Sequence, residues 1–406
     1  MVDVKILMLG WELPPHNSGG LGVACENIAR ALEKTGAEID FVVPYRAEHP
    51  GIDFMRILPA TDLNPLFRYG KSAYESSSID EKTIPSLAGP LSIRDVQRAY
   101  VAYVDDYLKT HRPDIVHAHD WLTYEAGLLA KERYGIPLVA HVHATEYDRA
   151  GGHSGNQTIH EIEERALIAA DRVITVSEAT RRLVHDKYHV PLEKISVIYN
   201  SLDDALVNSD YEFHRETYNY ITKLKNRGYT IVTTVGRFTI QKGLGFLMRG
   251  ASLAIKENPK LLFIFAGDGE EFDDLVALSA RLGIADHVVF TGFLRGDKLR
   301  DIYSLTDIFV MSSISDPFGL TALEAAHHGN CLILTRQSGV SELIWSALAY
   351  DYWDEEKLAH EILTIAASPA LREALSAAIS RECERVSWDD AAASCLNLYA
   401  KCLKRG

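Results

Sequence analysis

Two cations stand close together in the second half of the chain, where a strand should end and a helix should begin. Arg237 follows Gly236 at the end of the apolar run Ile231–Val235, and Lys242 precedes Gly243 at the start of the next helical pattern. Cations beside the amides of a helix N-terminus favour an anion. We therefore expect Gly236, Arg237 and Lys242 to bind a diphosphate, with a solvated surface pair as the alternative.

A second polar group follows in residues 315–324. Asp316 lies in a loop, and Glu324 stands eight residues later near the second turn of a helix. The helix begins at Gly319-Leu320-Thr321, whose amides should point at a phosphate or a sugar. The helix is otherwise apolar, and a carboxylate there needs a partner if it is buried. We expect Glu324 to accept hydrogen bonds from vicinal hydroxyls.

The first half opens with a glycine-rich turn after the apolar run 6–9. Gly19 and Gly20 let the backbone approach a ligand closely before a helix begins, although an empty turn would read the same way. The turn lacks the G-x-G-x-x-G spacing of a dinucleotide site. A phosphate loop at Gly70-Lys71-Ser72 is excluded too, because Pro65 stands where that loop needs glycine.

Four histidines occupy two predicted strand ends: His117, His119, His141 and His143. Alternate residues of a strand face the same way, so each pair could chelate a metal. The pairs lie on different strands, however, and nothing fixes a tetrahedral set. We expect no metal, and hydrogen bonds within the core for most rings, with one or two at the strand tips facing a cleft.

The elements that must position these residues follow from the alternation of apolar runs with helical patterns, which is typical of parallel sheets with crossover helices. The predicted strands are Val4–Leu9, Ile39–Val43, Ile115–His117, Leu138–His141, Arg172–Val176, Ile195–Ile198, Ile231–Val235, Leu261–Phe265, Val288–Phe290, Ile308–Met311 and Cys331–Leu334. The polar segment Asp203–Tyr229 should connect two domains, and the tail from Pro369 should form two helices broken near 387–389. Ligands of doubly wound α/β domains bind at the carboxyl ends of strands.

Bulk properties exclude several classes of protein. The 406 residues suit two α/β domains, and a net charge of −14 disfavours nucleic-acid binding. We expect no targeting signal at either end, and no stretch approaches the roughly 20 apolar residues that span a bilayer. Five cysteines without paired spacing fit buried free thiols in a reducing compartment. We expect a cytoplasmic protein without a transmembrane segment.

At these residues the chain resembles glycosyltransferase family 4, which has the GT-B fold of two Rossmann-like doubly wound domains facing a central cleft. The likeness covers almost the whole chain. Its motifs are Gly19–Gly22, His119–Trp121, His143–Glu146, Asn200–Asp203, Gly236–Arg237, Lys242–Gly243, Gly267–Gly269, Thr291–Phe293 and Asp316–Glu324. We expect an acceptor-side domain over 1–202, a donor-binding domain over 203–386, and a terminal helix over 387–406 that returns to the first domain.

The resemblance implies catalytic roles for four residues. Arg237 and Lys242 would bind the donor diphosphate and stabilise the leaving group. Asp316 would contact the donor sugar as the first carboxylate of an E-x7-E motif, and His143 would lie beside the anomeric centre. The remaining donor-binding candidates are Gly19, Gly20, Gly236, Gly292, Phe293, Gly319, Leu320, Thr321 and Glu324. Glu324 would contact the ribose, and backbone groups near Gly292 and Phe293 would hold the base. The candidates for acceptor contacts are Glu12, His16, Asp120 and Glu146.

The chain departs from the family pattern in three places. The first carboxylate is Asp316 rather than the commoner Glu, Ser201 replaces a turn glycine, and His16-Asn17-Ser18 replaces the lysine of glycogen and starch synthases. The last departure argues against glycogen elongation itself. Three other motifs nonetheless resemble those of a glycogen synthase-like subgroup: Gly10-Trp11-Glu12, His143–Arg149 and Phe293–Gly296.

The sequence therefore predicts a retaining glycosyltransferase that moves a sugar, in the first place glucose, from a UDP- or ADP-sugar to a hydroxyl acceptor such as an α-glucan or other glycan. It needs no cofactor and no metal if Arg237, Lys242 and helix amides neutralise the diphosphate. The alternatives are a sugar-nucleotide 2-epimerase, a phosphorylase-type enzyme, and a non-catalytic sugar-nucleotide-binding protein. The sequence does not identify the acceptor, the linkage or the oligomeric state. The acceptor-side loop 62–92 contains no motif that indicates a particular acceptor.

Overall fold

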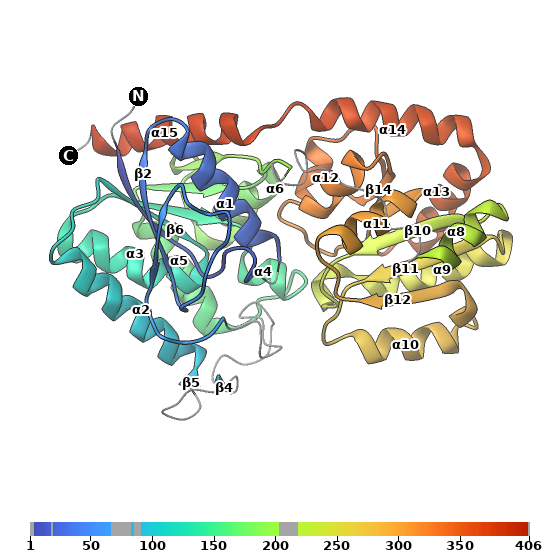
Figure 1. Ribbon diagram of the computed structural model, residues 1–406, viewed down its shortest axis with the longest axis horizontal. Helices are drawn as coiled ribbons and strands as arrows, with labels where there is room; N and C mark the ends of the chain where they lie inside the picture. Colours follow the sequence, from blue (N-terminus) through green and yellow to red (C-terminus); the bar gives the residue numbers. More distant parts are fainter. Residues whose placement is uncertain (1–3, 18, 66–82, 85–90, 203–217, 405–406) are drawn as a thin grey trace. The chain divides into compact units, whose positions relative to one another are not determined.

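Contacts divide the chain into two compact units. The computed structural model describes residues 4–17, 19–65, 83–84, 91–202 and 218–404. One unit comprises Met1–Asp203 together with Ser387–Gly406, and the other comprises Asp204–Val386 (Figure 1). Each unit is a parallel β-sheet covered by helices on both faces, so the predicted pair of doubly wound α/β domains is confirmed.

In the described part of the first unit, seven parallel strands form one sheet in the order β3-β2-β1-β6-β7-β8-β9. They are β1 (Lys5–Leu9), β2 (Glu38–Val43), β3 (Arg56–Pro59), β6 (Ile115–His119), β7 (Leu138–Val142), β8 (Arg172–Thr175) and β9 (Ile195–Val197). The short strands β4 (Thr83–Ile84) and β5 (Leu91–Ser92) pair with each other in antiparallel fashion. Leu7 and Leu9 enter one core cluster while Ile6 and Met8 enter another, which explains why a strand buried on both faces reads as an unbroken apolar run.

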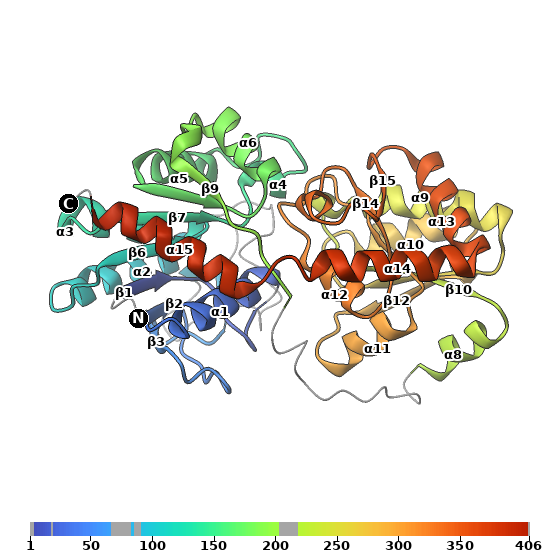
Figure 2. The same cartoon turned by 90° about the horizontal axis from the view of Figure 1, so that it is seen from above.

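The helices of the first unit cover both faces of this sheet. They are α1 (Gly20–Glu33), α2 (Ile93–Leu108), α3 (Trp121–Tyr134), α4 (Glu146–Arg149), α5 (Gln157–Ala169), α6 (Glu178–Tyr188), the 3-10 turn η2 (Leu192–Lys194) and α15 (Trp388–Leu403). One face packs against α2, α3 and α5, and the other against α1 and α15. Figure 2 shows α15 running alongside α1, which it contacts.

The second unit contains a six-stranded parallel sheet in its described part, in the order β12-β11-β10-β13-β14-β15. Its strands are β10 (Thr230–Val235), β11 (Leu261–Ala266), β12 (Val288–Gly292), β13 (Ile308–Met311), β14 (Cys331–Thr335) and β15 (Leu348–Tyr350). Its helices are α8 (Asn219–Asn226), η3 (Ile240–Lys242), α9 (Leu244–Glu257), α10 (Phe272–Arg281), η4 (Ala285–His287), α11 (Asp297–Leu305), α12 (Leu320–His327), η5 (Gly339–Glu342), α13 (Glu355–Ala367) and α14 (Pro369–Cys383). The sheet order makes β10 and β13 neighbours, so the loops that follow these two strands share one edge.

The structure differs from the sequence reading in two kinds of place. The edge strand β3 and the three-residue β15 were not expected, because neither has a long apolar run. The segment 203–229 was expected to be a connection throughout; residues 203–217 lie outside the described part, but Ile221 and Leu224 of α8 are buried in the second unit. The expected break in the tail is present, since Ser387 caps α15 by accepting the amide of Asp390 (3.1 Å).

Among the described residues, no single helix is both long and apolar enough to cross a membrane. One strongly bent combination, Glu355–Ala367 with Pro369–Leu403, meets the length and composition requirement only when both parts are taken together.

Candidate functional site

A pocket lies at the carboxyl ends of β10 and β13 in the second unit. Its lining includes Gly236 from the end of β10, Lys242 from η3, Ser312 and Ser313 from the end of β13, and Thr321 from α12. The structure therefore brings three predicted donor residues, Gly236, Lys242 and Thr321, to one place. The position agrees with the rule that doubly wound sheets bind ligands where their strands end.

Lys242 and Asp316 form an ion pair in this pocket region. Lys242 Nζ lies 2.6 Å from Asp316 Oδ2, and the two side chains are 23% and 8% exposed. Ser313 Oγ donates to the same carboxylate oxygen (3.1 Å), and the amide of Phe318 donates to Oδ1 (3.3 Å). The ammonium group has three protons to donate, so it can hold this carboxylate and an incoming phosphate oxygen together.

The backbone around Arg237 is shaped by a close approach of two loops. A Cβ on Gly267 would lie 1.8 Å from the carbonyl oxygen of Gly236, so this contact requires glycine. The amide of Phe238 donates to Asp268 O (2.8 Å) and thereby closes the loops around Arg237. Arg237 itself is half-buried and is not among the residues that line the pocket.

The start of α12 is the third part of this site. Gly319 caps the helix with φ of 110°, and a Cβ there would lie 2.8 Å from Met311 Cε. Leu320 is the first residue of the helix, and Thr321 behind it reaches the pocket. Glu324 is half-buried on the next turn, where Tyr303 Oη donates to its Oε2 (2.7 Å). The partner that sequence reasoning required for Glu324 is thus the fully buried Tyr303 of α11.

The other two predicted donor residues of this unit lie at the end of β12. Gly292 closes the strand with φ of 72°, and its carbonyl accepts the amide of Gly267 (3.0 Å). Phe293, which follows it, is 54% exposed. Arg295 lies over its ring, with Cζ 4.9 Å from the ring centroid. A contact between backbone groups here and the base stays a prediction.

In the first unit, the glycine turn leads into α1 as expected. Gly19 is the N-cap of α1, and Gly20 is its first residue. A Cβ on Gly19 would meet nothing within 4 Å, so the space beside it is open. His16 Nε2 bonds the carbonyl of Glu48 (2.9 Å), and Glu12 is buried at 7% exposure. Acceptor contacts for Glu12 and His16 stay predictions.

The four predicted histidines stack together: His117, His119 and His141 are buried on β6 and β7, and the partly exposed His143 follows β7. His117 Nε2 pairs with His141 Nδ1 (3.1 Å), and His119 Nδ1 pairs with His143 Nε2 (2.9 Å). Tyr399 of α15 bonds His117 Nδ1 (2.7 Å). Burial lowers the pKa of all four rings, that of His119 to about 3, so the rings are neutral at pH 7.

Ring nitrogens of the stacked histidines, together with the sulfur of Cys25, lie close enough together to be candidate metal ligands. Ligand atoms of His117, His119 and His141, and of Cys25, His119 and His143, lie within 4.8 Å of one another. An imidazole binds a metal in the plane of its ring, whereas His117 and His119 stack face to face with centroids 4.3 Å apart and planes 26° apart. Such stacked rings do not direct their nitrogens at one ion, but Nε2 of His119 and Nε2 of His141 are buried without a hydrogen-bond partner. The expectation that the protein holds no metal stays a prediction.

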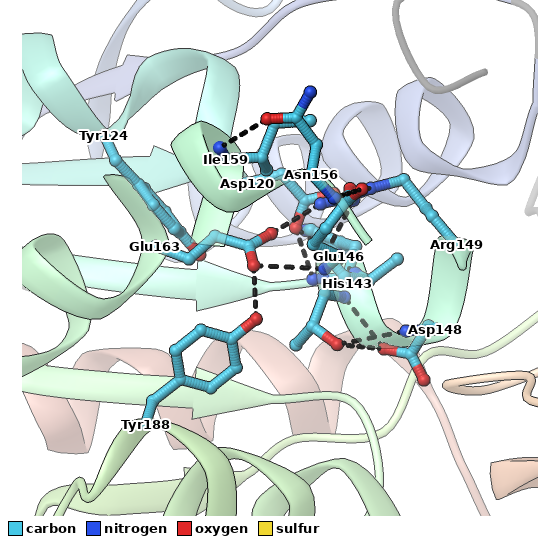
Figure 3. Close-up of polar contacts among 12 residues, drawn as sticks. Asp120, Tyr124, His143, Glu146, Asp148, Arg149, Asn156, Ile159, Glu163 and Tyr188 are labelled. Carbon is cyan, nitrogen blue, oxygen red and sulfur yellow. Dashed lines mark hydrogen bonds and ion pairs between the residues drawn. The ribbon is translucent and has the colours of Figure 1, made fainter. Parts of the chain in front are cut away.

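Asp120 and Glu146, both predicted as acceptor contacts, are buried at 1% exposure. Asp120 Oδ1 accepts the amide of His143 (2.7 Å), and burial raises the Asp120 pKa to about 7 against the opposing effect of Arg149. Glu146 Oε2 bonds Arg149 Nε (3.1 Å), and its Oε1 accepts the amide of Asn156 (2.8 Å) (Figure 3). Both carboxylates therefore hold the turn around His143, and acceptor contacts for them stay predictions.

Sequence reasoning assigned no role to several residues of these sites: Arg149, Glu163, Tyr188, Tyr303, Ser313 and Tyr399. A signal for one of them existed. Glu163 lies on the apolar face of α5 with Ile159, Ile162 and Ala166. The argument that a carboxylate on an apolar face needs a partner, which was applied to Glu324, applies to Glu163 in the same way.

Comparison with known proteins agrees with this geometry. Residues 18–206 match the model of Glycosyltransferase Family 4, and residues 220–381 match that of Glycosyl transferases group 1. An uncharacterized glycosyltransferase from Methanocaldococcus jannaschii is 28% identical over 98% of each chain. A glycogen synthase from Mycobacterium tuberculosis is 27% identical over 84% of this chain and 80% of the relative.

Among solved structures, the Anabaena protein HepE in complex with UDP and glucose aligns with a TM-score of 0.72, at 18% identity, over 98% of this chain and 100% of that chain. That likeness concerns the fold, which is GT-B. The two family matches together span most of the chain, and the first ends within a few residues of the boundary between the two units. The chain belongs to the GT-B glycosyltransferases that combine a family 4 domain with a group 1 domain.

Proposed function

We propose that the protein is a retaining glycosyltransferase that moves glucose from UDP-glucose or ADP-glucose to a hydroxyl of an α-glucan or another glycan. The observation that carries this proposal is the pocket at the ends of β10 and β13, where Lys242 stands beside Asp316 and Thr321. It combines a cation for a diphosphate with a carboxylate for a sugar. The relative named glycogen synthase and the HepE complex with UDP and glucose support the choice of substrates.

The chemistry follows from where charge develops. As the bond between C1 of the sugar and the phosphate oxygen breaks, its electron pair moves onto the departing diphosphate. Lys242, Arg237 and the amides at the start of α12 would stabilise that charge more than they stabilise the bound donor, which accelerates transfer. Asp316, fixed by Ser313 and Lys242, would accept hydrogen bonds from the sugar hydroxyls.

The acceptor oxygen would form the new bond to C1 on the face that the diphosphate leaves. Its proton would pass to the leaving phosphate oxygen, so that the configuration at C1 is retained. We assign His143 to the donor sugar and Glu324 to the ribose. If Lys242, Arg237 and the helix amides neutralise the diphosphate, no metal is needed for it, and we propose that catalysis uses no metal and no other cofactor.

One experiment separates this function from its alternatives. The protein is incubated with UDP-glucose or ADP-glucose alone, then with maltooligosaccharide added, and nucleotide release and the donor sugar are both measured. Nucleotide release that depends on the acceptor is the expected result. An isomerised donor would indicate a 2-epimerase instead, and binding without turnover across a panel of donors and acceptors would indicate a non-catalytic binding protein.

A further inference from the structure

The turn that follows β7 is held by buried carboxylates. Each of four consecutive backbone amides in residues 143–146 donates a hydrogen bond to a carboxylate (Figure 3). The four bonds are His143 N to Asp120 Oδ1 (2.7 Å), Ala144 N to Asp120 Oδ1 (3.3 Å), Thr145 N to Asp148 Oδ2 (2.8 Å) and Glu146 N to Glu163 Oε2 (3.0 Å). A turn whose every amide is tied in this way has little freedom to move.

Arg149 joins this turn to helix α5. Its Nη1 donates to the carbonyl of Ala144 (2.9 Å), its Nε to Glu146 Oε2 (3.1 Å) and its Nη2 to Glu163 Oε1 (2.5 Å). The three charged side chains are between 1% and 3% exposed. One guanidinium thus bonds the turn's backbone, the first residue of α4 and a carboxylate that comes from α5.

The buried ion pairs of Arg149 with Glu146 and Glu163 are not an efficient source of folding free energy. Each buried charge loses its hydration, and well-packed apolar residues are often as stable as a buried ion pair. Burial disfavours the charged form of Arg149, but Glu163, Asp120 and Glu146 outweigh that effect and raise its pKa. The hydroxyl of Tyr188 also donates to Glu163. What such a network supplies is a defined geometry.

The residue that this network positions is His143, at the start of the 143–146 turn. Thr145 and Glu146 are buried, whereas His143 and Ala144 at the start of the turn are partly exposed. The His143 ring is held as well, by its bond to His119 Nδ1 (2.9 Å). The buried network therefore lies behind the part of the turn that can reach a ligand.

We propose that Arg149 and Glu163 are positioning residues for His143: they hold the 143–146 turn so that His143 meets the donor sugar in one orientation. The inference rests on the role of His143 in the proposed function. Supporting residues behind a reacting group act by fixing its position, and a displacement of about 1 Å costs on the order of 100-fold in rate.

The test is a double-mutant cycle between Glu163→Gln and His143→Ala, with turnover measured at saturating donor. Glu163→Gln keeps the size of the side chain and removes the charge that pairs with Arg149. Turnover should fall about 10- to 100-fold while the donor KM changes little. In the His143→Ala background, Glu163→Gln should cause no further loss, because there is no imidazole left to misplace.

The matched control is Glu125→Gln, which removes another ion-paired carboxylate of the same unit, on α3, from its contact with Arg94 (2.8 Å). It should leave turnover unchanged. Equal losses from Glu163→Gln in both backgrounds would overturn the inference and leave the proposed function standing. Full activity of His143→Ala would overturn the role of His143, and this inference with it.

Amide hydrogen exchange provides a readout that does not depend on activity. Residues 143–146 should exchange slowly in the wild type and faster in Glu163→Gln, while the strand β7 keeps its protection. Rapid exchange at these residues in the wild type would overturn the inference. If Glu163→Gln does not fold, Tyr188→Phe removes one donor to Glu163 and should show the same dependence on His143 on a smaller scale.

Discussion

The Lys242–Asp316 pair leads to a prediction in which the effects on rate and on stability can be separated. Lys242→Ala removes a cation from the proposed diphosphate site, and the loss of one such group from a preorganised site lowers turnover on the order of 100- to 1,000-fold. It also leaves Asp316, whose side chain is 8% exposed, without its cation. We expect both consequences.

The size of the stability loss follows from burial. Breaking a fully buried pair costs about 3–5 kcal/mol, and breaking a surface pair costs about 0–1 kcal/mol. Lys242 is 23% exposed, and Asp316 keeps the hydrogen bonds from Ser313 and Phe318. We therefore expect a loss of about 1–2 kcal/mol in the unfolding of the second unit.

The assay combines initial rates of nucleotide release with thermal unfolding. Lys225→Ala is the matched control, because Lys225 pairs with Asp307 (3.1 Å) in the same unit at 30% and 19% exposure. It should lose stability and keep turnover. Asp316→Asn added to Lys242→Ala should recover stability without recovering turnover. A folded Lys242→Ala variant with the turnover of Lys225→Ala would refute the placement of the diphosphate.

Three further predictions follow from the described contacts. Tyr303→Phe should raise the donor KM about 5- to 30-fold, because Glu324 loses a charge-assisted hydrogen bond of roughly 1–2 kcal/mol. Initial rates at varied donor concentration measure this, and an unchanged KM would count against a contact between Glu324 and the ribose. Activity should persist in excess EDTA. A complete loss that one divalent ion restores would indicate a metal site at the four stacked histidines. The free energy of unfolding should fall as the pH drops from about 6.5 toward 3, because burial lowers the pKa of His119 to about 3 and the unfolded chain alone takes up the proton in that window. Denaturant unfolding at pH 7 and about pH 5 should show His119→Gln reducing this loss by about 2 kcal/mol, and an equal loss in both proteins would contradict it.

The sequence by itself predicted the two α/β domains and the edges at which their ligands should lie. Local pattern suffices for this, because an apolar run followed by glycine and a helical period marks the end of a strand wherever that strand is placed. Gly236, Lys242 and Thr321 were expected at strand-to-helix turns and meet in the pocket. The burial argument for Glu324 was sound as well, although it could not name Tyr303 as the partner.

Only the tertiary structure decided which groups pair. Lys242 and Asp316 are 74 residues apart and meet because β10 and β13 are neighbours, an order that no local period encodes. His117 bonds Tyr399 across 282 residues because the last helix, α15, packs beside α1 on that face of the sheet. Asp120 looked available to a ligand, yet the register of β6 and β7 places its carboxylate under the amide of His143. Periodicity determines which face of an element is buried, but the partner across that face depends on strand order, register and helix placement, which the whole chain settles together.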